Sequence, residues 1–130
     1  MAYNFLIVDD SATTRTIIKR ILELSTIEIG ELYEAENGLE ALDVLQSKWI
    51  DLVFADINMP RMNGVEMVQR MSEDGMLKTI PVVIVSSEGS ETRIEEMMSK
   101  GIKAYLRKPF TPENIKDLAE KILNPDKGGQ

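Results

Sequence analysis

The stretch LVFADINMP, residues 52–60, decides the fold of this 130-residue chain. Its first four residues are apolar, which is typical of a short strand buried on both faces of a sheet, and Asp56 follows them directly. Pro60 prevents regular strand pairing from continuing. We therefore expect Asp56 at the end of a buried strand, either as an ordinary solvated acid or as a group held there for chemistry.

Strand-like and helical patterns alternate along the rest of the chain. Strands are expected at residues 5–8, 31–36, 52–55, 81–85 and 104–106. Helices are expected from a cap near Ser11 to Ser25, from Leu39 to Ser47, from Val65 to Asp74, through Ile94 to Lys100, and after a cap at Thr111. Five such βα units in series predict a parallel sheet with helices on both faces.

The composition of the strands predicts their order in that sheet. Residues 5–8, 52–55 and 81–85 are wholly apolar and should be central, whereas residues 31–36 and 104–106 include charged or polar side chains and should lie at the edges. This arrangement fits the flavodoxin-like α/β fold, a (βα)5 three-layer sandwich with strand order 2-1-3-4-5.

Composition and charge exclude several function classes. The chain contains no cysteine and no histidine, so a bound metal must have oxygen ligands, which favours Mg²⁺ or Ca²⁺. A net charge of -7 opposes nucleic-acid binding. No apolar run has transmembrane length, so we expect a cytoplasmic protein without a membrane partner. We also expect one domain at residues 1–124 and a flexible tail at 125–130.

Charged and polar residues follow the expected strands at the points where they end. Asp9 and Asp10 follow the first strand, Asp56 the third, Ser86 the fourth and Lys108 the fifth. Because the carboxyl ends of parallel strands meet at one edge of a sheet, these side chains should converge. Three clustered carboxylates repel one another unless a cation lies among them, and Mg²⁺ commonly joins carboxylates to a phosphoryl group. The edge is therefore predicted to support phosphate chemistry.

In this order, these residues resemble the receiver domain of response regulators of the stand-alone CheY type, a known example of the strand order above. The resemblance covers residues 4–123 and is carried by Asp9-Asp10, by Asp56 within DINMP, by Asn63-Gly64, by Ser86 and by Lys108-Pro109-Phe110. It implies that a partner histidine kinase transfers a phosphoryl group to Asp56. A phosphorylation-dependent target protein would then bind, in chemotaxis or a related two-component pathway.

The resemblance also implies how the metal is held. Asp10 and Asp56 would bind Mg²⁺ directly together with the backbone carbonyl of Asn58, and Asp9 would act mainly through water. A cis peptide bond is implied before Pro109.

Further roles follow from the same resemblance. Lys108 would offer its positive charge, and Ser86 its hydroxyl, to the phosphoryl oxygens. Ser86 and Tyr105 would move together when the phosphoryl group arrives, changing the surface of the fourth helix, fifth strand and fifth helix. Asn58 and Glu88 would tune the lifetime of the phosphorylated state to seconds or minutes.

Other functions remain open from the sequence. We expect a monomer that catalyses only its own phosphorylation and dephosphorylation and is not otherwise an enzyme. A phosphorelay intermediate would use the same residues. A Mg²⁺-dependent phosphohydrolase with Asp56 as nucleophile usually needs a second acid two residues later, where Asn58 stands. A scaffold module of the same fold would bind metal without becoming phosphorylated.

Overall fold

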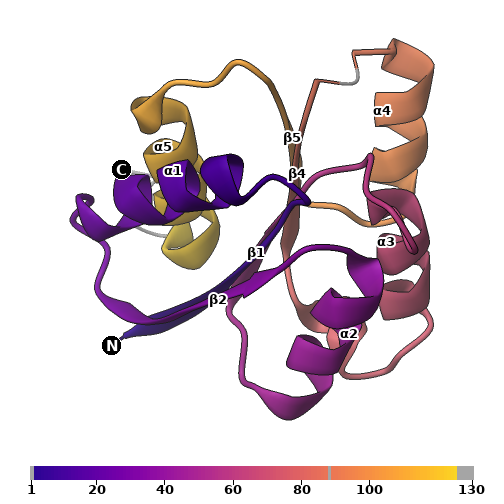
Figure 1. Ribbon diagram of the computed structural model, residues 1–130, viewed down its shortest axis with the longest axis horizontal. Coiled ribbons are helices and arrows are strands. Elements are labelled where there is room, and N and C mark those ends of the chain that lie inside the picture. Colours follow the sequence, from indigo (N-terminus) through magenta and orange to yellow (C-terminus); the bar gives the residue numbers. More distant parts are fainter. Residues whose placement is uncertain (1, 88, 126–130) are drawn as a thin grey trace.

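The computed structural model describes residues 2–87 and 89–125, and within them strands and helices alternate (Figure 1). The elements are β1 (Tyr3–Val8), α1 (Ala12–Glu23), β2 (Ile29–Ala35), α2 (Gly38–Ser47), β3 (Leu52–Ala55), α3 (Gly64–Ser72), the 3-10 helix η1 (Leu77–Thr79), β4 (Val82–Ser86), α4 (Glu91–Ser99), β5 (Ala104–Arg107) and α5 (Pro112–Leu123). Apart from Pro125, the expected tail lies outside the described residues, so its flexibility and the domain boundary stay predictions.

All the strands of the sheet run parallel, in the order β2-β1-β3-β4-β5. Every residue of β3 and β4 is buried, and so are the last four residues of β1, whereas β2 and β5 are mostly half-buried or exposed. The apolar strands are therefore central and the mixed strands lie at the edges. The flavodoxin-like fold predicted from the sequence is confirmed.

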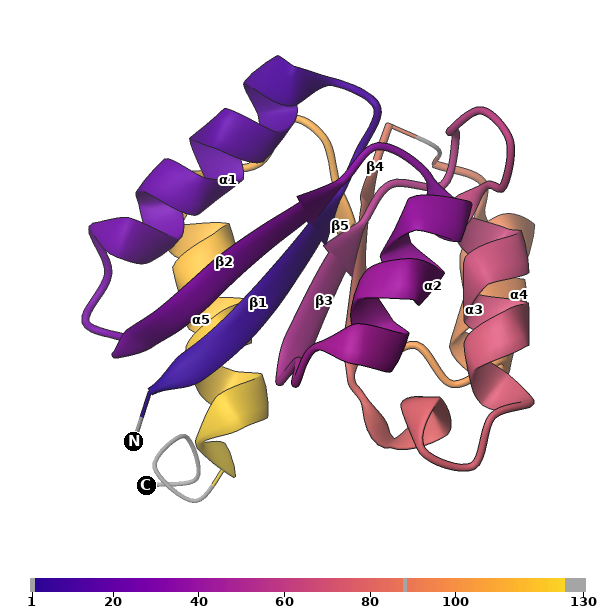
Figure 2. The same cartoon turned by 60° about the horizontal axis from the view of Figure 1, so that its bottom comes forward.

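Helices cover both faces of the sheet (Figures 1 and 2). On one face, α1 and α5 enclose a core that includes Phe5, Ile7, Ile18, Leu22, Phe54, Val85, Ile115 and Ala119. On the other face, α2, α3 and α4 enclose Leu6, Val53, Ala55, Leu45, Met67, Val68, Ile84 and Met97. Among the described residues, no helix combines the length and apolar character that a bilayer span needs.

Two large apolar side chains are more exposed than their apolar character predicts. Trp49 is 74% exposed. Its indole N–H donates a hydrogen bond to Oδ1 of Asp51, at 3.0 Å. Met98 is 46% exposed, whereas its neighbour Met97 is fully buried. Adjacent residues of a helix point about 100° apart, so the short pattern around Met97 did not decide which methionine faces the sheet.

The chain between α3 and β4 contains η1, which the sequence pattern did not predict. The Asp74 carboxylate accepts hydrogen bonds from the backbone N–H groups of Met76 and Leu77, at 2.8 and 3.0 Å. These bonds stabilise the turn from which η1 starts. Leu77, the first residue of η1, is buried.

Candidate functional site

Asp9 and Asp10 lie in the turn between β1 and α1, and their surroundings differ. The backbone N–H of Asp9 donates to the carbonyl of Ala35 on β2 at 3.1 Å, and its Oδ1 accepts from the backbone N–H of Ser11 at 2.8 Å. Ser11 in turn caps α1, as expected, by accepting from the N–H of Thr14. Asp9 is therefore only 3% exposed, whereas Asp10 is exposed at the same edge of the sheet.

Asp56 follows β3 directly and is held by the main chain around it. Its backbone N–H donates to the carbonyl of Val8 at 3.0 Å, and its Oδ1 accepts from the backbone N–H of Ile57 at 2.7 Å. Gly64, the first residue of α3, donates to the carbonyl of Ile57 at 2.8 Å. A Cβ atom at Gly64 would collide with the backbone carbonyl of Asp56, so glycine allows α3 to begin directly against this strand end.

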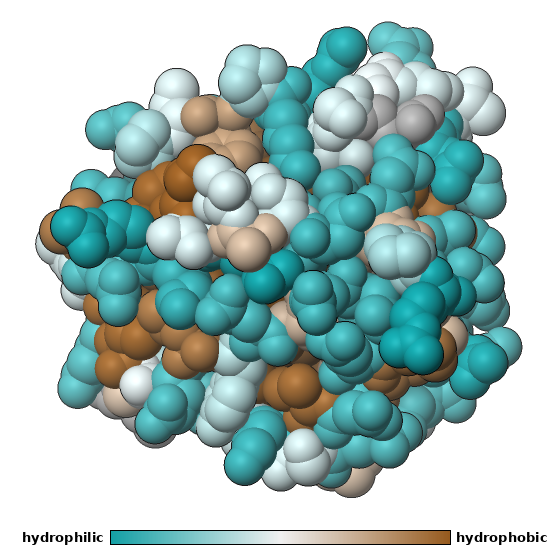
Figure 3. Space-filling view, in the orientation of Figure 1, coloured by the Kyte–Doolittle hydropathy of each residue, from teal (hydrophilic) through white to brown (hydrophobic). Residues whose placement is uncertain are grey.

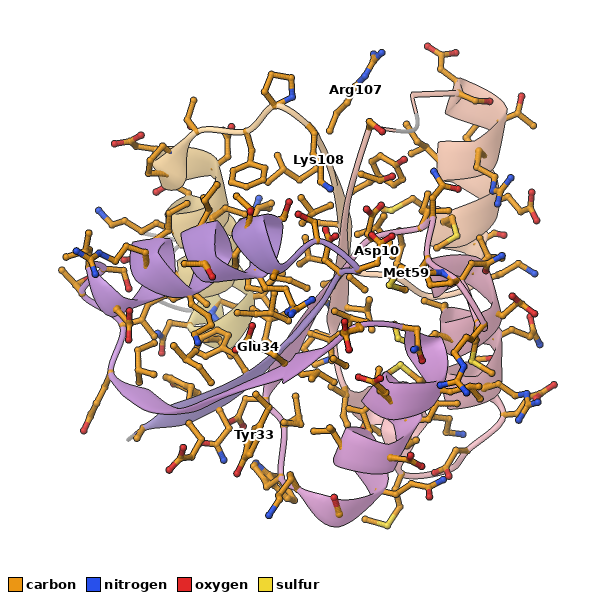
Figure 4. The ribbon with its side chains drawn as sticks, in the orientation of Figure 1. Asp10, Tyr33, Glu34, Met59, Arg107 and Lys108 are labelled. Atoms are coloured by element: carbon orange, nitrogen blue, oxygen red, sulfur yellow. The ribbon has the colours of Figure 1, made fainter. Side chains whose placement is uncertain are left out.

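The structure brings three acids and one cation together at the carboxyl edge of the sheet. Carboxylate oxygens of Asp9, Asp10 and Asp56 lie within 4.8 Å of one another. Nζ of Lys108 lies 3.1 Å from Oδ2 of Asp9 and 3.1 Å from Oδ2 of Asp56. Figure 4 shows Lys108 and Asp10 at this edge, whereas Arg107 points outward.

The arrangement of the acids fits a hard divalent cation. Because the chain has no histidine or cysteine, the side-chain ligands at this edge are oxygen atoms. Carboxylate oxygens this close together repel one another, and a cation among them removes that repulsion. The cluster of Asp9, Asp10 and Asp56 therefore suits Mg²⁺, which binds carboxylates and commonly keeps some of its waters.

Burial and charge change the protonation behaviour of this cluster. Burial raises the pKa of Asp9, and it outweighs the opposing hydrogen bonds from the Ser11 N–H and Lys108. Burial alone would lower the pKa of Lys108, but its hydrogen bond to Asp9 and the charge of Asp56 prevail, so that pKa is raised. Lys108 is therefore a permanent cation at neutral pH, and the ionised form of Asp9 is the form that a bound cation would stabilise most.

Ser86 and Lys108 reach the same edge from β4 and β5. Ser86, the last residue of β4, is fully buried and is paired in register with Arg107. The backbone N–H of Lys108 donates to the carbonyl of Ser86 at 2.9 Å, which continues the pairing of the two strands by one residue. The peptide bond between Lys108 and Pro109 is cis, as expected.

The other predicted site residues are Asn58, Tyr105 and Glu88. Asn58 is exposed two residues beyond Asp56. Tyr105 is half-buried on β5, pairs in register with Ile84 and packs against the core beneath α2, α3 and α4. Glu88 lies outside the residues that the structure describes. The roles assigned to these three residues from the sequence stay predictions.

Sequence reasoning missed one residue at the edge, Arg15. Its Nη1 donates to the carbonyl of Asp9 at 2.6 Å, and its Nε donates to the Glu34 carboxylate at 2.9 Å. The first turn of α1 contains no acid, and Arg15 follows soon after the cap. A cation close to the positive end of a helix is unfavourable in itself, so this placement was a signal that Arg15 has a specific partner.

A comparison with protein families identifies the family of this chain. The model of the response regulator receiver domain matches residues 5–120, most of the chain and the whole edge described above. The chain belongs to the response regulator receiver domain family. The chain is a CheY-like receiver domain of the two-component type, and its acidic cluster fits the Mg²⁺ pocket of the family. Its CheY-type relatives are signalling proteins rather than classical enzymes.

The relatives of this receiver domain include chemotaxis proteins. It is 35% identical over 124 residues to a chemotaxis protein CheY homolog of Campylobacter jejuni, covering 95% of this chain and 94% of that protein. The structure of CheY4 of Vibrio cholerae matches with a TM-score of 0.83 and 29% identity, over 94% of this chain and 99% of that one. CheY in a complex with CheX, BeF3 and Mg²⁺ from Borrelia burgdorferi matches with a TM-score of 0.84 and 28% identity, over 93% and 89% of the two chains.

Proposed function

We propose that this receiver domain accepts a phosphoryl group on Asp56 from a phosphohistidine of a partner kinase. One observation carries the proposal: the Lys108 ammonium lies 3.1 Å from both Asp9 and Asp56, in a cluster whose third acid, Asp10, is exposed. Such a cluster combines a carboxylate nucleophile, ligands for a divalent cation and a fixed positive charge for phosphoryl oxygens.

The transfer forms one bond and breaks another. An oxygen of Asp56 bonds to phosphorus while the bond between phosphorus and the donor histidine nitrogen breaks, and that nitrogen takes a proton from water. Oδ1 of Asp56 accepts from the N–H of Ile57, and Oδ2 accepts from Lys108. We place the reaction at Oδ2, because it faces the cation that would bind the phosphoryl oxygens. Mg²⁺ bound by the acids, with the Asn58 carbonyl, would neutralise charge on the phosphoryl oxygens.

The phosphoryl group on Asp56 changes the charge next to β4 and β5. The Ser86 hydroxyl donates to one phosphoryl oxygen and Lys108 binds another, which draws the end of β4 toward Asp56. Tyr105 lies on the neighbouring strand, beside Ile84 of β4. The coupled movement of Ser86 and Tyr105 alters the surface formed by α4, β5 and α5, to which a target protein binds, in chemotaxis or a related pathway.

The same residues would serve a phosphorelay intermediate, which passes the phosphoryl group on to another histidine. Asn58 and Glu88 flank the pocket in sequence and set the lifetime of the phosphorylated state, which we expect to be seconds to minutes. A target protein that binds only the phosphorylated surface would identify the chain as a signalling messenger rather than as a phosphorelay intermediate.

The overall charge limits the partners of the phosphorylated protein. The net charge is -7, and the face shown in Figure 3 is mainly hydrophilic with separate hydrophobic patches. We propose that the protein acts as a cytoplasmic monomer and that its partners are proteins rather than nucleic acid or a membrane, because its charge repels phosphate backbones and anionic lipids.

Intact mass after incubation with acetyl phosphate and Mg²⁺ tests the proposal. The native protein should gain one phosphoryl group, Asp56→Asn should gain none, and Asp117→Asn, which removes an exposed acid on α5, should behave as the native protein does. If no adduct forms in the native protein, the chain is a metal-binding or scaffold module. If the native protein instead hydrolyses a phosphate ester continuously, it acts as a Mg²⁺-dependent phosphohydrolase.

A further inference from the structure

Arg15 joins the end of β1 to β2 through its guanidinium group. Nη1 donates to the backbone carbonyl of Asp9 at 2.6 Å, and Nε donates to Oε1 of Glu34 at 2.9 Å. The Arg15 side chain is 12% exposed and the Glu34 side chain 34%, so the bond to the Asp9 carbonyl is better shielded from water than the bond to Glu34. Figure 4 shows Glu34 on β2, on the side of that strand that α1 covers.

The contact with Asp9 is at the peptide group that leads into Asp10. The side chain of Asp9 is already fixed, because Oδ1 accepts from the Ser11 N–H and Oδ2 accepts from Lys108. Arg15 fixes the carbonyl of the same residue. Together these bonds set the direction in which the chain leaves β1, and hence where the exposed carboxylate of Asp10 lies relative to Asp56.

We propose that Arg15 is a positioning residue for the metal pocket, holding the Asp9 carbonyl so that the carboxylates of Asp9 and Asp10 face the same ion as Asp56. Arg15 touches neither the ion nor the phosphoryl group. The inference rests on the proposed function only in requiring that the acidic cluster binds Mg²⁺. Residues that orient metal ligands in this way typically contribute about 10-fold to 100-fold in metal affinity.

A purely structural role for Arg15 would be to attach α1 to β2. Lys19, one turn further along α1, also serves that role, since its Nζ lies 2.9 Å from Oε2 of Glu34. The described hydrogen bonds of Lys19 go to Glu34 and not to the Asp9 carbonyl. Lys19→Gln therefore removes one positive charge and one bond between α1 and β2 but leaves the β1 end intact, which makes it a matched control.

Titration calorimetry with Mg²⁺ on the full chain tests the inference, with the melting temperature of each metal-free variant as a second measurement. Arg15→Gln should weaken Mg²⁺ binding about tenfold. Lys19→Gln should change the Kd by less than about twofold. Arg15→Lys should fall between Arg15→Gln and the native protein, because one ammonium keeps the charge but cannot span Asp9 and Glu34 as the guanidinium does.

The outcomes separate this inference from the proposed function. If the native protein binds Mg²⁺ and both Arg15→Gln and Lys19→Gln lower the melting temperature without changing the Kd, Arg15 is purely structural and the inference is wrong. If Arg15→Gln does not fold, Arg15→Lys decides, and a Kd equal to that of the native protein overturns the inference. If the native protein itself does not bind Mg²⁺, the proposed function fails and the inference falls with it.

Discussion

Nζ of Lys108 lies 3.1 Å from Oδ2 of Asp56. The same nitrogen is equally close to Oδ2 of Asp9, so one ammonium offsets two acids of the cluster when no ion is bound. A divalent cation that enters the cluster must share these acids with Lys108. The lysine therefore opposes binding of the metal and favours binding of the phosphoryl group, because the first is a cation and the second an anion.

Replacing Lys108 should separate these two effects. Lys108→Met removes the charge and keeps an apolar stem, so Mg²⁺ should bind about fivefold more tightly, which corresponds to about 1 kcal/mol of removed repulsion. Transfer from acetyl phosphate should become slower. Calorimetry and intact mass measure the two quantities, and Lys121→Met, an exposed position on α5, is the control. Weaker Mg²⁺ binding in Lys108→Met would contradict this account of the cluster.

A side chain at Gly64 should damage the pocket through the backbone. Gly64→Ala places a methyl group against the carbonyl of Asp56, so α3 or the strand end must shift. We expect a loss of about 1–3 kcal/mol in the free energy of unfolding and a lower rate of phosphorylation. Denaturant unfolding measures the change in the free energy of unfolding. Gly75→Ala is the control, since no atom lies within 4 Å of the added Cβ, and equal effects at both positions would refute the prediction.

Arg61, in the loop between β3 and α3, has a backbone conformation that asparagine should adopt more readily than arginine. Its φ of 66° lies in the left-handed region, which asparagine tolerates and arginine does not favour. Because Arg61 is exposed, we expect Arg61→Asn to raise the free energy of unfolding by about 0.5–1 kcal/mol. The same change at exposed Arg70 in α3 should lower it, since asparagine is a poor helix former. A loss of stability at both positions would contradict the prediction.

Glu34 should contribute stability that depends on pH. The hydrogen bond from Lys19, opposed by burial and supported by Arg15, lowers the pKa of Glu34 below its ordinary 4.5. A carboxyl whose pKa is lower in the folded protein stabilises the fold above the unfolded pKa, and this contribution is lost as the pH falls through the folded pKa. Unfolding of the native protein and Glu34→Gln should therefore differ most at neutral pH, with the difference shrinking below about pH 4.5. A difference that is constant with pH would exclude this contribution.

The fold could be predicted because its signals are local. Each central strand is a short run of apolar residues, and each helix presents apolar residues at helical spacing. Asp9, Asp10, Asp56 and Lys108 could be named in advance because each follows a strand, and parallel strands place their ends at one edge. That geometric rule predicts which residues gather, although it leaves their roles to experiment.

The remaining features depend on contacts between distant segments. Arg15 is oriented by a carbonyl at the end of β1 and by a carboxylate on β2, and periodicity encodes neither. The need for glycine at position 64 arises only when α3 packs against the end of β3.

Asp9 and Lys108 are 99 residues apart in the chain and yet share one ion pair. The acceptor site is therefore completed only when the fifth strand has joined the sheet. A partly synthesised or clipped copy without the fifth strand would keep the acids and lack the counter-charge, so under the proposed function it should accept a phosphoryl group more slowly than the complete chain does. Under the proposed function, efficient phosphorylation would therefore require that both ends of the sheet have folded.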